Sequence, residues 1–185
     1  IKAEEYWAEK GGVRLFLFRK CLPHSASAQA PVLFLVHGSS LSARTGFDLD
    51  VPGKPGYSMM DWFARRGFDV WTMDHENYGR SSRTRSNSDI ASGADDLAAA
   101  LPIVMENSGA TRLHLFGSSS GALRAGLFAN RHPDRVASLS LDAFVWTGEG
   151  SPTLEKRRDN LDAFRKEPTR DVDRAFFHSI FNRDK

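Results

Sequence analysis

Three consecutive serines, Ser118, Ser119 and Ser120, stand between Gly117 and Gly121. The five residues fit the pattern Gly-x-Ser-x-Gly, in which the middle serine occupies a sharp turn between a strand and a helix. Glycines at the flanks leave room for a strained turn, and the free N–H groups at the start of the helix point toward the same place. A hydroxyl held in this way becomes a nucleophile once a base takes its proton. We therefore predict that Ser119 is the nucleophile.

A polar Gly/Ser turn that only caps the following helix is the alternative interpretation, because so short a pattern often arises by chance. The context distinguishes the two interpretations. The run "TRLHLFG" predicts a strand directly before the serines, and "SSGALRAGLFANRHP" predicts a helix directly after them. A Gly-x-Ser-x-Gly turn that presents a nucleophile requires this order of elements, so the context favours the nucleophile.

Strands and helices are expected to alternate along most of the chain. Gly11-Gly12 separates two strand-like runs and predicts a hairpin. Two apolar runs, "PVLFLVHG" and "FDVWTMD", suit strands that are covered on both faces, and "TRLHLFG" and "VASLSLDAFV" predict two further strands. Helices are predicted at "SMMDWFARRG", after the serines, and at "DIASGADDLAAALPIVMENSG", which Pro102 should kink or split. We therefore expect an α/β fold with a doubly wound, mostly parallel sheet and helices on both faces.

The alternation ends at Trp146, after which no strand-like run follows. The segments "LEKRRDNLDAFRKEP" and "DVDRAFFHSIFNRDK" each predict one amphipathic helix. We assign residues 1–146 to the N-terminal part of an α/β core and residues 147–185 to a helical cap or lid. The apolar faces of this cap would contact either an apolar or aromatic substrate or the core itself. They carry Leu161, Phe164, Phe176, Phe177 and Phe181.

The composition restricts the classes of partner and the compartment. Of the 185 residues, 25 are Lys or Arg and 23 are Asp or Glu, so the net charge of +2 gives no reason to expect nucleic acid or an anionic membrane as partner. Cys21 is the only cysteine, which excludes a disulfide within the chain and a cysteine-based metal site. A lone cysteine favours the cytoplasm, but the localisation stays open because the chain begins at Ile1 and a leader could precede it.

Four segments of the sequence resemble the α/β-hydrolase family. "LFLVHGSS" is similar to the His-Gly segment after the third strand, and "MDHENYGRSS" is similar to the segment after the fourth. "LFGSSSGALRAG" resembles the nucleophile turn, and "RHPDRVASLSLDA" resembles the approach to the sixth strand. The resemblance covers almost all of residues 1–146. It implies that the backbone amides of Ser39 and Ser120 form an oxyanion hole, with Ser40 as the alternative to Ser39.

Two departures from the family pattern fall in "MDHENYGRSS". Glu76 stands where the family usually has Arg, and Asn77 stands where it usually has Gly. Asn tolerates a positive φ better than most residues, so we expect the turn to survive. Loss of the arginine removes a charge contact and should affect local packing rather than chemistry. The loop after the His-Gly segment is also longer than the minimal pattern, and its Asp48, Asp50 and Tyr57 either reach the pocket or face solvent.

The resemblance implies an acid and a histidine that follow the serine in chain order. Asp142 ends the sixth expected strand, where a minority of the family carry the acid, and is our candidate. The alternative is a carboxylate that anchors the following loop. The commoner position of the acid follows a seventh strand, for which the sequence offers no run. The histidines are His24, His37, His75, His114, His132 and His178, and none follows a final strand. We interpret His37 as structural and His178 as a packing or pocket residue.

The base is therefore expected outside this chain. These 185 residues would be the N-terminal portion of a larger hydrolase, with the rest of the core on a separate chain or missing. A sheet that stops at the sixth strand leaves an uncovered edge, which is prone to aggregation. The expected partners are a small-molecule substrate and a C-terminal fragment or second chain of the same protein, and oligomerisation is left open.

The expected reaction is the hydrolysis of a carboxylic ester or amide of a small, apolar or aromatic substrate, through a Ser-His-Asp triad and an acyl-enzyme. This chemistry needs no metal and no organic cofactor. A serine in the turn argues against the dehalogenase and epoxide hydrolase branches of the family, which carry Asp there. Three alternatives keep the fold: an acyltransferase or a C–C bond hydrolase that uses the same serine, and a receptor that binds a small molecule without turnover.

Overall fold

The computed structural model describes residues 1–23, 30–145, 147–167 and 173–181. Within these ranges it leaves out the side chains of Thr153, Phe177, Ser179, Ile180 and Phe181. His24, and the side chains of Phe177 and Phe181 that were assigned to the apolar face of the cap, therefore lie outside the described residues. The chain divides into two compact units, of which the first comprises residues 1–84 and 88–146 and the second comprises residues 85–87 and 147–185.

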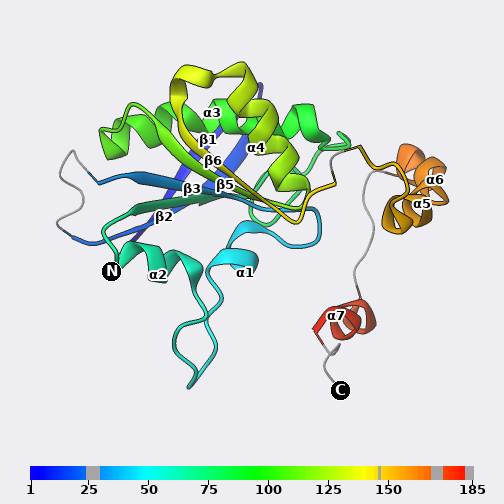
Figure 1. The fold of residues 1–185 in the computed structure, drawn as a ribbon, viewed down its shortest axis with the longest axis horizontal. Helices are drawn as coiled ribbons and strands as arrows, with labels where there is room; N and C mark the ends of the chain where they lie inside the picture. Colours follow the sequence, from blue (N-terminus) through cyan, green and yellow to red (C-terminus); the bar gives the residue numbers. More distant parts are fainter. Residues whose placement is uncertain (24–29, 146, 168–172, 182–185) are drawn as a thin grey trace. The chain divides into compact units, whose positions relative to one another are not determined.

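Six strands form one sheet in the first unit, in the order β1-β2-β4-β3-β5-β6 (Figure 1). β1 and β2 form an antiparallel hairpin through Gly11-Gly12, as predicted, and β2 pairs antiparallel with β4. The remaining neighbours are parallel. The expected α/β fold with a mostly parallel sheet is therefore confirmed. The strands, in chain order, span Lys2–Lys10, Val13–Cys21, Val32–Val36, Asp69–Met73, Leu113–Ser118 and Val136–Asp142.

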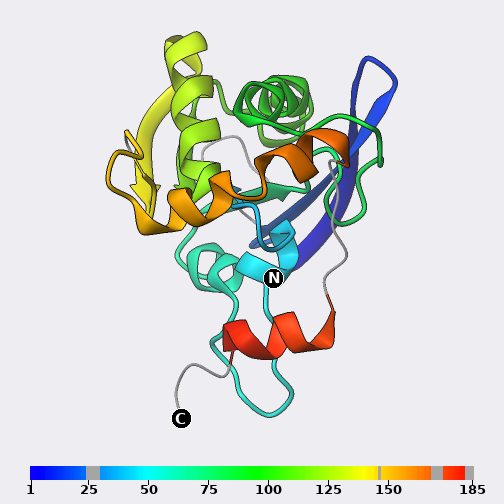
Figure 2. The ribbon, with the colours of Figure 1, turned by 90° about the vertical axis from the view of Figure 1, so that its right-hand side faces the viewer.

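Helices cover both faces of the sheet, also as expected (Figure 1). α3 (Ile90–Ser108) and α4 (Ser120–Arg131) lie on one face, whereas α1 (Ala43–Phe47) and α2 (Met59–Ala64) lie on the other. A short 3₁₀ turn, Pro133–Arg135, leads into β6. Figure 2 shows the β1–β2 hairpin and β6 at opposite edges of the sheet.

Alternate residues of β3 contribute to two separate cores. Phe34 packs in a cluster with Leu97 of α3 and Phe128 of α4. Leu35 packs in the opposite cluster with Met60 of α2. Every residue of β3 is buried. Because side chains alternate across a strand, a strand covered on both faces needs an unbroken apolar run, which is what the sequence shows here.

α3 runs unbroken through Pro102, so of the two predicted effects of this proline a split of the helix is wrong, and a kink stays a prediction. The side chain of Asp89 caps the helix by accepting the Ser92 N–H at 2.8 Å, and Gly109 ends it with a φ of 71°. Pro102 forfeits one intrahelical hydrogen bond. The buried face nevertheless continues past the proline to Val104, and packing against the sheet outweighs the lost bond.

The long loop after the His-Gly segment contains α1, which the sequence interpretation missed. The Ala43 N–H at its start donates to Asp74 Oδ1 at 2.9 Å, and Asp74 directly follows β4. A helix of five residues that includes Gly46 has little propensity to form alone. The contact with Asp74, which is remote in the sequence, therefore holds this turn of helix in place.

The described part of the second unit contains α5 (Pro152–Arg158), α6 (Leu161–Lys166) and α7 (Arg174–Phe181). The prediction of one continuous helix over "LEKRRDNLDAFRKEP" is therefore wrong. The chain turns at Asp159-Asn160, because short polar side chains compete for backbone hydrogen bonds and favour turns over helix interiors. The role of this unit as a cap, and of His178 in α7 as a pocket residue, stays a prediction.

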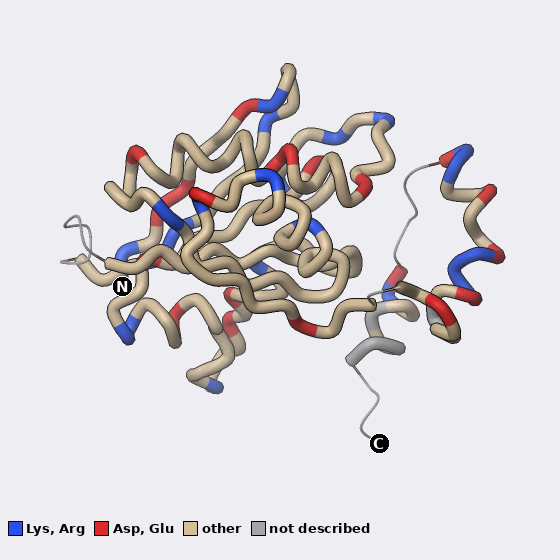
Figure 3. Tube along the Cα trace, turned by 45° about the horizontal axis from the view of Figure 1, so that its top comes forward, with Lys and Arg blue, Asp and Glu red and all other residues tan. Residues whose placement is uncertain are grey.

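Charged residues of both signs are interspersed along the described trace (Figure 3). No helix in the described part of the chain combines the length and the apolar composition needed to cross a membrane. Among the described residues, no group of three or more His, Cys, Asp or Glu side chains is placed to hold a metal ion.

Candidate active site

Ser119 occupies the turn between β5 and α4, with a φ of 56° and a ψ of −124°. Residues other than glycine rarely adopt such a backbone conformation, because the Cβ atom crowds the chain. Strain of this kind persists only where the surrounding structure enforces it, and it clusters at functional sites. The strained turn that the sequence predicts is therefore present.

Two glycines allow this serine turn (residues 117–121) to pack. A Cβ atom on Gly117 would lie 2.5 Å from the carbonyl oxygen of Gly121 and 2.7 Å from the Cα of Ala122. A Cβ atom on Gly121 would overlap the carbonyl oxygens of Val36 and His37, at the end of β3. A side chain at either glycine would therefore push α4 away from the sheet.

The Ser119 hydroxyl forms no hydrogen bond with any described group. Its backbone N–H donates to the carbonyl oxygen of Asp142 at 2.9 Å, which ties the serine turn to the end of β6. The residue is partly exposed. The main chain of Ser119 is thus held while its Oγ atom remains available to a base or a reactant.

The segment that should supply the second oxyanion amide lies against the serine. A Cβ atom on Gly38 would stand 3.0 Å from the Cβ and 3.5 Å from the Oγ of Ser119. The N–H groups of Ser39 and Ser120 donate to no group in the described residues, and Ser120 is the first residue of α4. Both amides are free to bind an oxygen. Their role as oxyanion donors, and the choice of Ser39 over Ser40, stays a prediction.

Asp142, the candidate acid, ends β6 directly opposite Ser118. Its Oδ2 atom accepts a hydrogen bond from the Ser118 hydroxyl at 3.0 Å, and the side chain is exposed. The next residue, Ala143, has a φ of 49°, so the chain turns sharply here. These contacts agree with the alternative that the carboxylate anchors the turn, and its catalytic role stays a prediction.

None of the histidines described in the first unit forms a hydrogen bond with Ser119. His37 and His75 are buried just after β3 and β4, respectively. His114 lies on β5 and faces an apolar groove, whereas His132 packs against an aromatic ring of α4. Among the described residues of the first unit, the predicted nucleophile and the predicted oxyanion amides therefore lie together without a base.

A buried polar cluster (Lys10, His75, Glu76 and Asp96) adjoins His37, and the sequence interpretation missed it. The Nδ1 atom of His75 lies 3.0 Å from one carboxylate oxygen of Asp96, and the Nζ atom of Lys10 lies 2.5 Å from the other. The Glu76 N–H also donates to Asp96, at 3.1 Å. The residues come from β1, α3 and the turn after β4, so no local signal in the sequence could have revealed the cluster.

Glu76 makes a charge contact of its own after the fourth strand, which the sequence interpretation did not anticipate. Its side chain is buried and accepts a hydrogen bond from Lys10 at 2.9 Å, with further contacts to Thr84 and Ser92. Lys10 therefore balances the acidic residue that replaces the family's arginine. Asn77 adopts a φ of 71°, which confirms that asparagine supports the turn.

Burial determines the charges in this cluster. It lowers the pKa of His75 to about 4 and holds the pKa of His37 well below its ordinary value of 6.5, with the neighbouring His75 adding to the latter effect. Burial also opposes the negative charge of Asp96, but His75 and Lys10 keep the pKa of that carboxyl below its ordinary value. At neutral pH the Asp96 carboxylate thus faces the Lys10 ammonium group and the neutral imidazole of His75.

The loop residues Asp48, Asp50 and Tyr57 lie away from the serine turn. The carboxylate of Asp48 is buried, 2.5 Å from the Nζ atom of Lys20, and accepts the Ser58 hydroxyl at 2.6 Å. Asp50 and Tyr57 are exposed beside a polar hollow of about 380 Å³. Asp48 therefore has a structural role that neither alternative for this loop anticipated.

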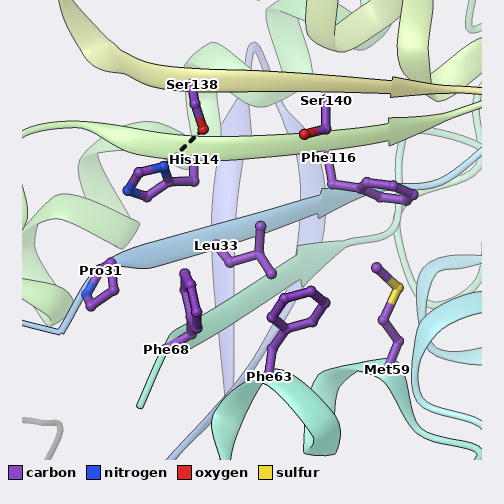
Figure 4. A pocket seen from close by; sticks show the side chains of 9 residues that line it. All are labelled: Pro31, Leu33, Met59, Phe63, Phe68, His114, Phe116, Ser138 and Ser140. Carbon is purple, nitrogen blue, oxygen red and sulfur yellow. Dashed lines mark hydrogen bonds between the residues drawn. The ribbon is translucent and has the colours of Figure 1, made fainter. Parts of the chain in front are cut away.

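An apolar groove of about 390 Å³ lies on the face of the sheet that carries α2 (Figure 4). His114 points into it and bonds to Ser138 through its Nδ1 atom at 2.8 Å (Figure 4). The groove is lined by Pro31, Leu33, Met59, Phe63, Phe68, His114, Phe116, Ser138 and Ser140. Ser119 does not line it, so this groove is separate from the candidate site.

Two curated relatives match the chain in sequence. The 2-hydroxy-6-oxononadienedioate/2-hydroxy-6-oxononatrienedioate hydrolase of Paraburkholderia phymatum is 31% identical over 137 residues, which cover 70% of this chain and 41% of the relative. The protein of the same name from Burkholderia vietnamiensis is 32% identical over 128 residues, which cover 65% of this chain and 38% of the relative. The chain therefore spans about two fifths of the length of these relatives.

Solved structures share the fold at lower identity. The thioesterase domain from the curacin biosynthetic pathway has a TM-score of 0.66 and 21% identity, covering 98% of this chain and 63% of that chain. A bacterial membrane phospholipase A has a TM-score of 0.62 and 22% identity, covering 85% and 46%. Epoxide hydrolase A from Mycobacterium thermoresistibile has a TM-score of 0.58 and 24% identity, covering 85% and 44%. At these identities the likeness supports the fold alone.

A family model described as the alpha/beta hydrolase fold matches residues 31–181. This span begins immediately before β3, includes the serine turn and continues into the second unit. The order of the sheet and the strained serine after β5 agree with that match. The chain therefore belongs to the alpha/beta hydrolase family.

Proposed function

We propose that the protein that carries this chain is a hydrolase in which Ser119 attacks a carbonyl carbon. One observation carries the proposal: a partly exposed hydroxyl stands on a turn with a φ of 56°, at the start of α4, without a hydrogen bond to any described group. A serine with a purely structural role gains no stability from such a position. The cost of the strained turn is explained if the hydroxyl is used in a reaction.

In the proposed reaction the Ser119 Oγ atom bonds to the carbonyl carbon of an ester or amide while a base takes its proton. The carbonyl oxygen becomes an oxyanion, which the N–H groups of Ser39 and Ser120 stabilise by about 3 kcal/mol each. The base then returns the proton to the departing alcohol or amine and leaves an acyl-enzyme. Water, deprotonated by the same base, releases the acid and restores the hydroxyl.

We propose further that another polypeptide of the same protein supplies the base. β6 is an edge of the sheet, and its Leu139 and Leu141 are 38% and 39% exposed. An exposed apolar strand edge is a ready template for the addition of another strand. The imidazole would arrive with that polypeptide, and either Asp142 or a carboxylate from the added chain would orient it.

A second reaction is favoured by the two curated relatives. Their names denote hydrolysis of an unsaturated hydroxy-oxo dicarboxylate, a class of substrate that contains no ester or amide bond. The Ser119 Oγ atom would bond to the ketone carbon of such a substrate, and the adjacent carbon–carbon bond would break as the departing carbon takes the proton held by the base. Water would then release the second product from the acyl-enzyme. C–C bond hydrolysis is therefore the second candidate, beside cleavage of a small apolar or aromatic ester.

Covalent labelling and turnover test the proposal together. The complete gene product is treated with an aryl phosphonate, and the modified residue is located by peptide mass spectrometry. Labelling of Ser119, with turnover of 4-nitrophenyl butyrate or of a 2-hydroxy-6-oxo-dienoate that Ser119→Ala abolishes, supports a serine hydrolase. Ser138→Ala, on β6, is the matched serine control. Full turnover by Ser119→Ala would overturn the proposal, and labelling without turnover of either substrate would favour a receptor.

A further inference from the structure

His37 connects the buried polar cluster to the segment beside the nucleophile. It is 2% exposed and directly follows β3. The backbone N–H of His75 donates to its Nε2 atom at 3.1 Å, so Nε2 is an acceptor and carries no proton. The ring proton therefore sits on Nδ1, which lies 2.6 Å from the carbonyl oxygen of Gly38. His37 thus donates to the Gly38 carbonyl in a single tautomer that His75 imposes.

The Gly38 carbonyl and the Ser39 N–H belong to the same peptide group. A trans peptide is planar, so its C=O and N–H bonds point in opposite directions, and the described part of the chain contains no cis peptide bond. A side chain that holds the Gly38 oxygen therefore also sets the direction of the Ser39 N–H. This peptide lies at the site, since a Cβ atom on Gly38 would be 3.5 Å from the Ser119 hydroxyl oxygen.

We propose that His37 is a positioning residue: by holding the Gly38 carbonyl, it turns the Ser39 N–H toward the oxyanion that forms at Ser119. This inference rests on the proposed function and adds a residue that touches neither the substrate nor the nucleophile. Tyr78 supports the same segment, because its hydroxyl donates to the Ser39 carbonyl at 3.3 Å and its ring lies 4.8 Å from that of His37. Two successive carbonyls are therefore each held by a side chain.

The surroundings of His37 preserve the required tautomer. Burial lowers its pKa well below 6.5, and the His75 ring and the Arg124 guanidinium lower it further, whereas the Gly38 carbonyl and Asp96 act in the opposite direction. Protonation of Nε2 would bring two N–H groups face to face and break the link to His75. The neutral ring therefore keeps both hydrogen bonds through neutral pH.

Two substitutions separate the two hydrogen bonds of His37. In His37→Asn the amide nitrogen stands near the position of Nδ1 and can still donate to Gly38, whereas in His37→Gln the amide reaches the position of Nε2 and faces His75 instead. We expect His37→Gln to lower kcat on 4-nitrophenyl butyrate about 100-fold with KM changed less than about threefold. His37→Asn should retain kcat within about tenfold of the wild type. His114→Gln, in the apolar groove, is the matched control.

A merely structural role for His37 predicts a different result. Both variants would then lower the amount of folded protein, while kcat per labelled Ser119, titrated with the phosphonate, would stay unchanged. A trifluoromethyl ketone, which forms a tetrahedral adduct with Ser119, should bind His37→Gln about 100-fold more weakly, with butyrate binding unaltered. Equal affinity of wild type and His37→Gln for the ketone would overturn the inference.

Nitrogen-15 NMR of histidine-labelled wild-type protein tests the tautomer without any substitution. The His37 signals, assigned by their loss in His37→Asn, should show a proton on Nδ1 and none on Nε2 at neutral pH. A proton on Nε2 would overturn the inference whatever the kinetics of the variants. Failure of the proposed function is recognised separately, because Ser119→Ala would then retain full turnover while the tautomer of His37 stayed as described.

Discussion

The two sides of the candidate site are built differently. On the nucleophile side, the serine turn packs so closely on β3 that Gly117 and Gly121 have no room for a Cβ atom, and the buried His37 holds the adjacent peptide. On the β6 side, the carboxylate of Asp142 is exposed and bonded only to the Ser118 hydroxyl among the described groups. One side is rigidly held by its neighbours, whereas the other lies open at the edge of the sheet.

The difference follows from the layers of the fold. α3 and α4 cover the sheet on one face, and α3 contributes the buried Asp96 to the polar cluster, whereas β6 is an edge strand whose residues after Val136 are all exposed. Amides that stabilise an oxyanion act by being held in place before the reaction, so they belong to the packed side. In the proposed function, the groups that move a proton are brought to the open side. The proposal thus separates the two tasks of a hydrolase along one sheet.

Ser119→Ala, on the nucleophile side, should have the largest effect on activity. We expect kcat/KM of the complete protein to fall by at least about 10⁴-fold, because neither Ser118 nor Ser120 has the strained backbone conformation that presents the Ser119 hydroxyl. The measurement is steady-state turnover of the ester and of the dienoate, with Ser138→Ala as control. A loss of less than tenfold on both substrates would remove Ser119 from the reaction.

Gly121→Ala disturbs the same side through packing. The added methyl group overlaps the carbonyl oxygens of Val36 and His37, and we expect a destabilisation of about 3 kcal/mol with loss of phosphonate labelling. Urea unfolding measures the free energy. Gly126→Ala is the matched control on α4, since its added Cβ meets nothing within 4 Å. If the two variants were equally stable, the close contact between α4 and β3 would be refuted.

Acid should weaken the packed side through His75. Its pKa is about 4 in the folded chain and about 6.5 when unfolded, so the unfolded state binds the proton first as the pH falls. The contribution of His75 to the free energy of unfolding is therefore fully present above pH 6.5. It declines by about 3 kcal/mol as the pH falls from 6.5 to 4. Urea unfolding across this range measures the loss, which His75→Asn should reduce. A stability that stays constant across this range would contradict a buried neutral His75.

Asp142→Ala tests the open side and should cost about 1 kcal/mol, the value of one exposed hydrogen bond to Ser118. Ser118→Ala should cost the same, and the double variant no more than either, in urea unfolding. Turnover then separates the two roles of the carboxylate. A loss of kcat/KM confined to Asp142→Ala would identify the acid, whereas equal losses in both variants would identify an anchor.

Leu141→Ala should have the smallest effect. In a polypeptide of residues 1–185 the side chain is 39% exposed, and we expect the free energy of unfolding to change by less than about 0.5 kcal/mol. In the complete protein, where we propose that the edge is covered, the cost should rise to about 2 kcal/mol. A small effect in both polypeptides would argue against coverage of β6.

Local patterns were sufficient to predict the sheet and the strained turn. An unbroken apolar run specifies a strand covered on both faces, and glycines around Ser119 specify a turn, because both depend on neighbouring residues only. Prediction failed where contacts between remote residues decide the conformation. Asp74 stabilises α1 from the end of β4, and packing against the sheet carries α3 through Pro102.

By itself the sequence determined the order of the elements, the family to which they belong and the position of the candidate nucleophile. Only the tertiary structure decided which side chains support that nucleophile. The hairpin, the turn after β4 and α3 converge in the fold, and this brings together Lys10, His75 and Asp96. The backbone N–H of His75 then determines the tautomer of His37. Hydrogen bonds and burial depend on distance in space, which the order of residues along a chain does not contain.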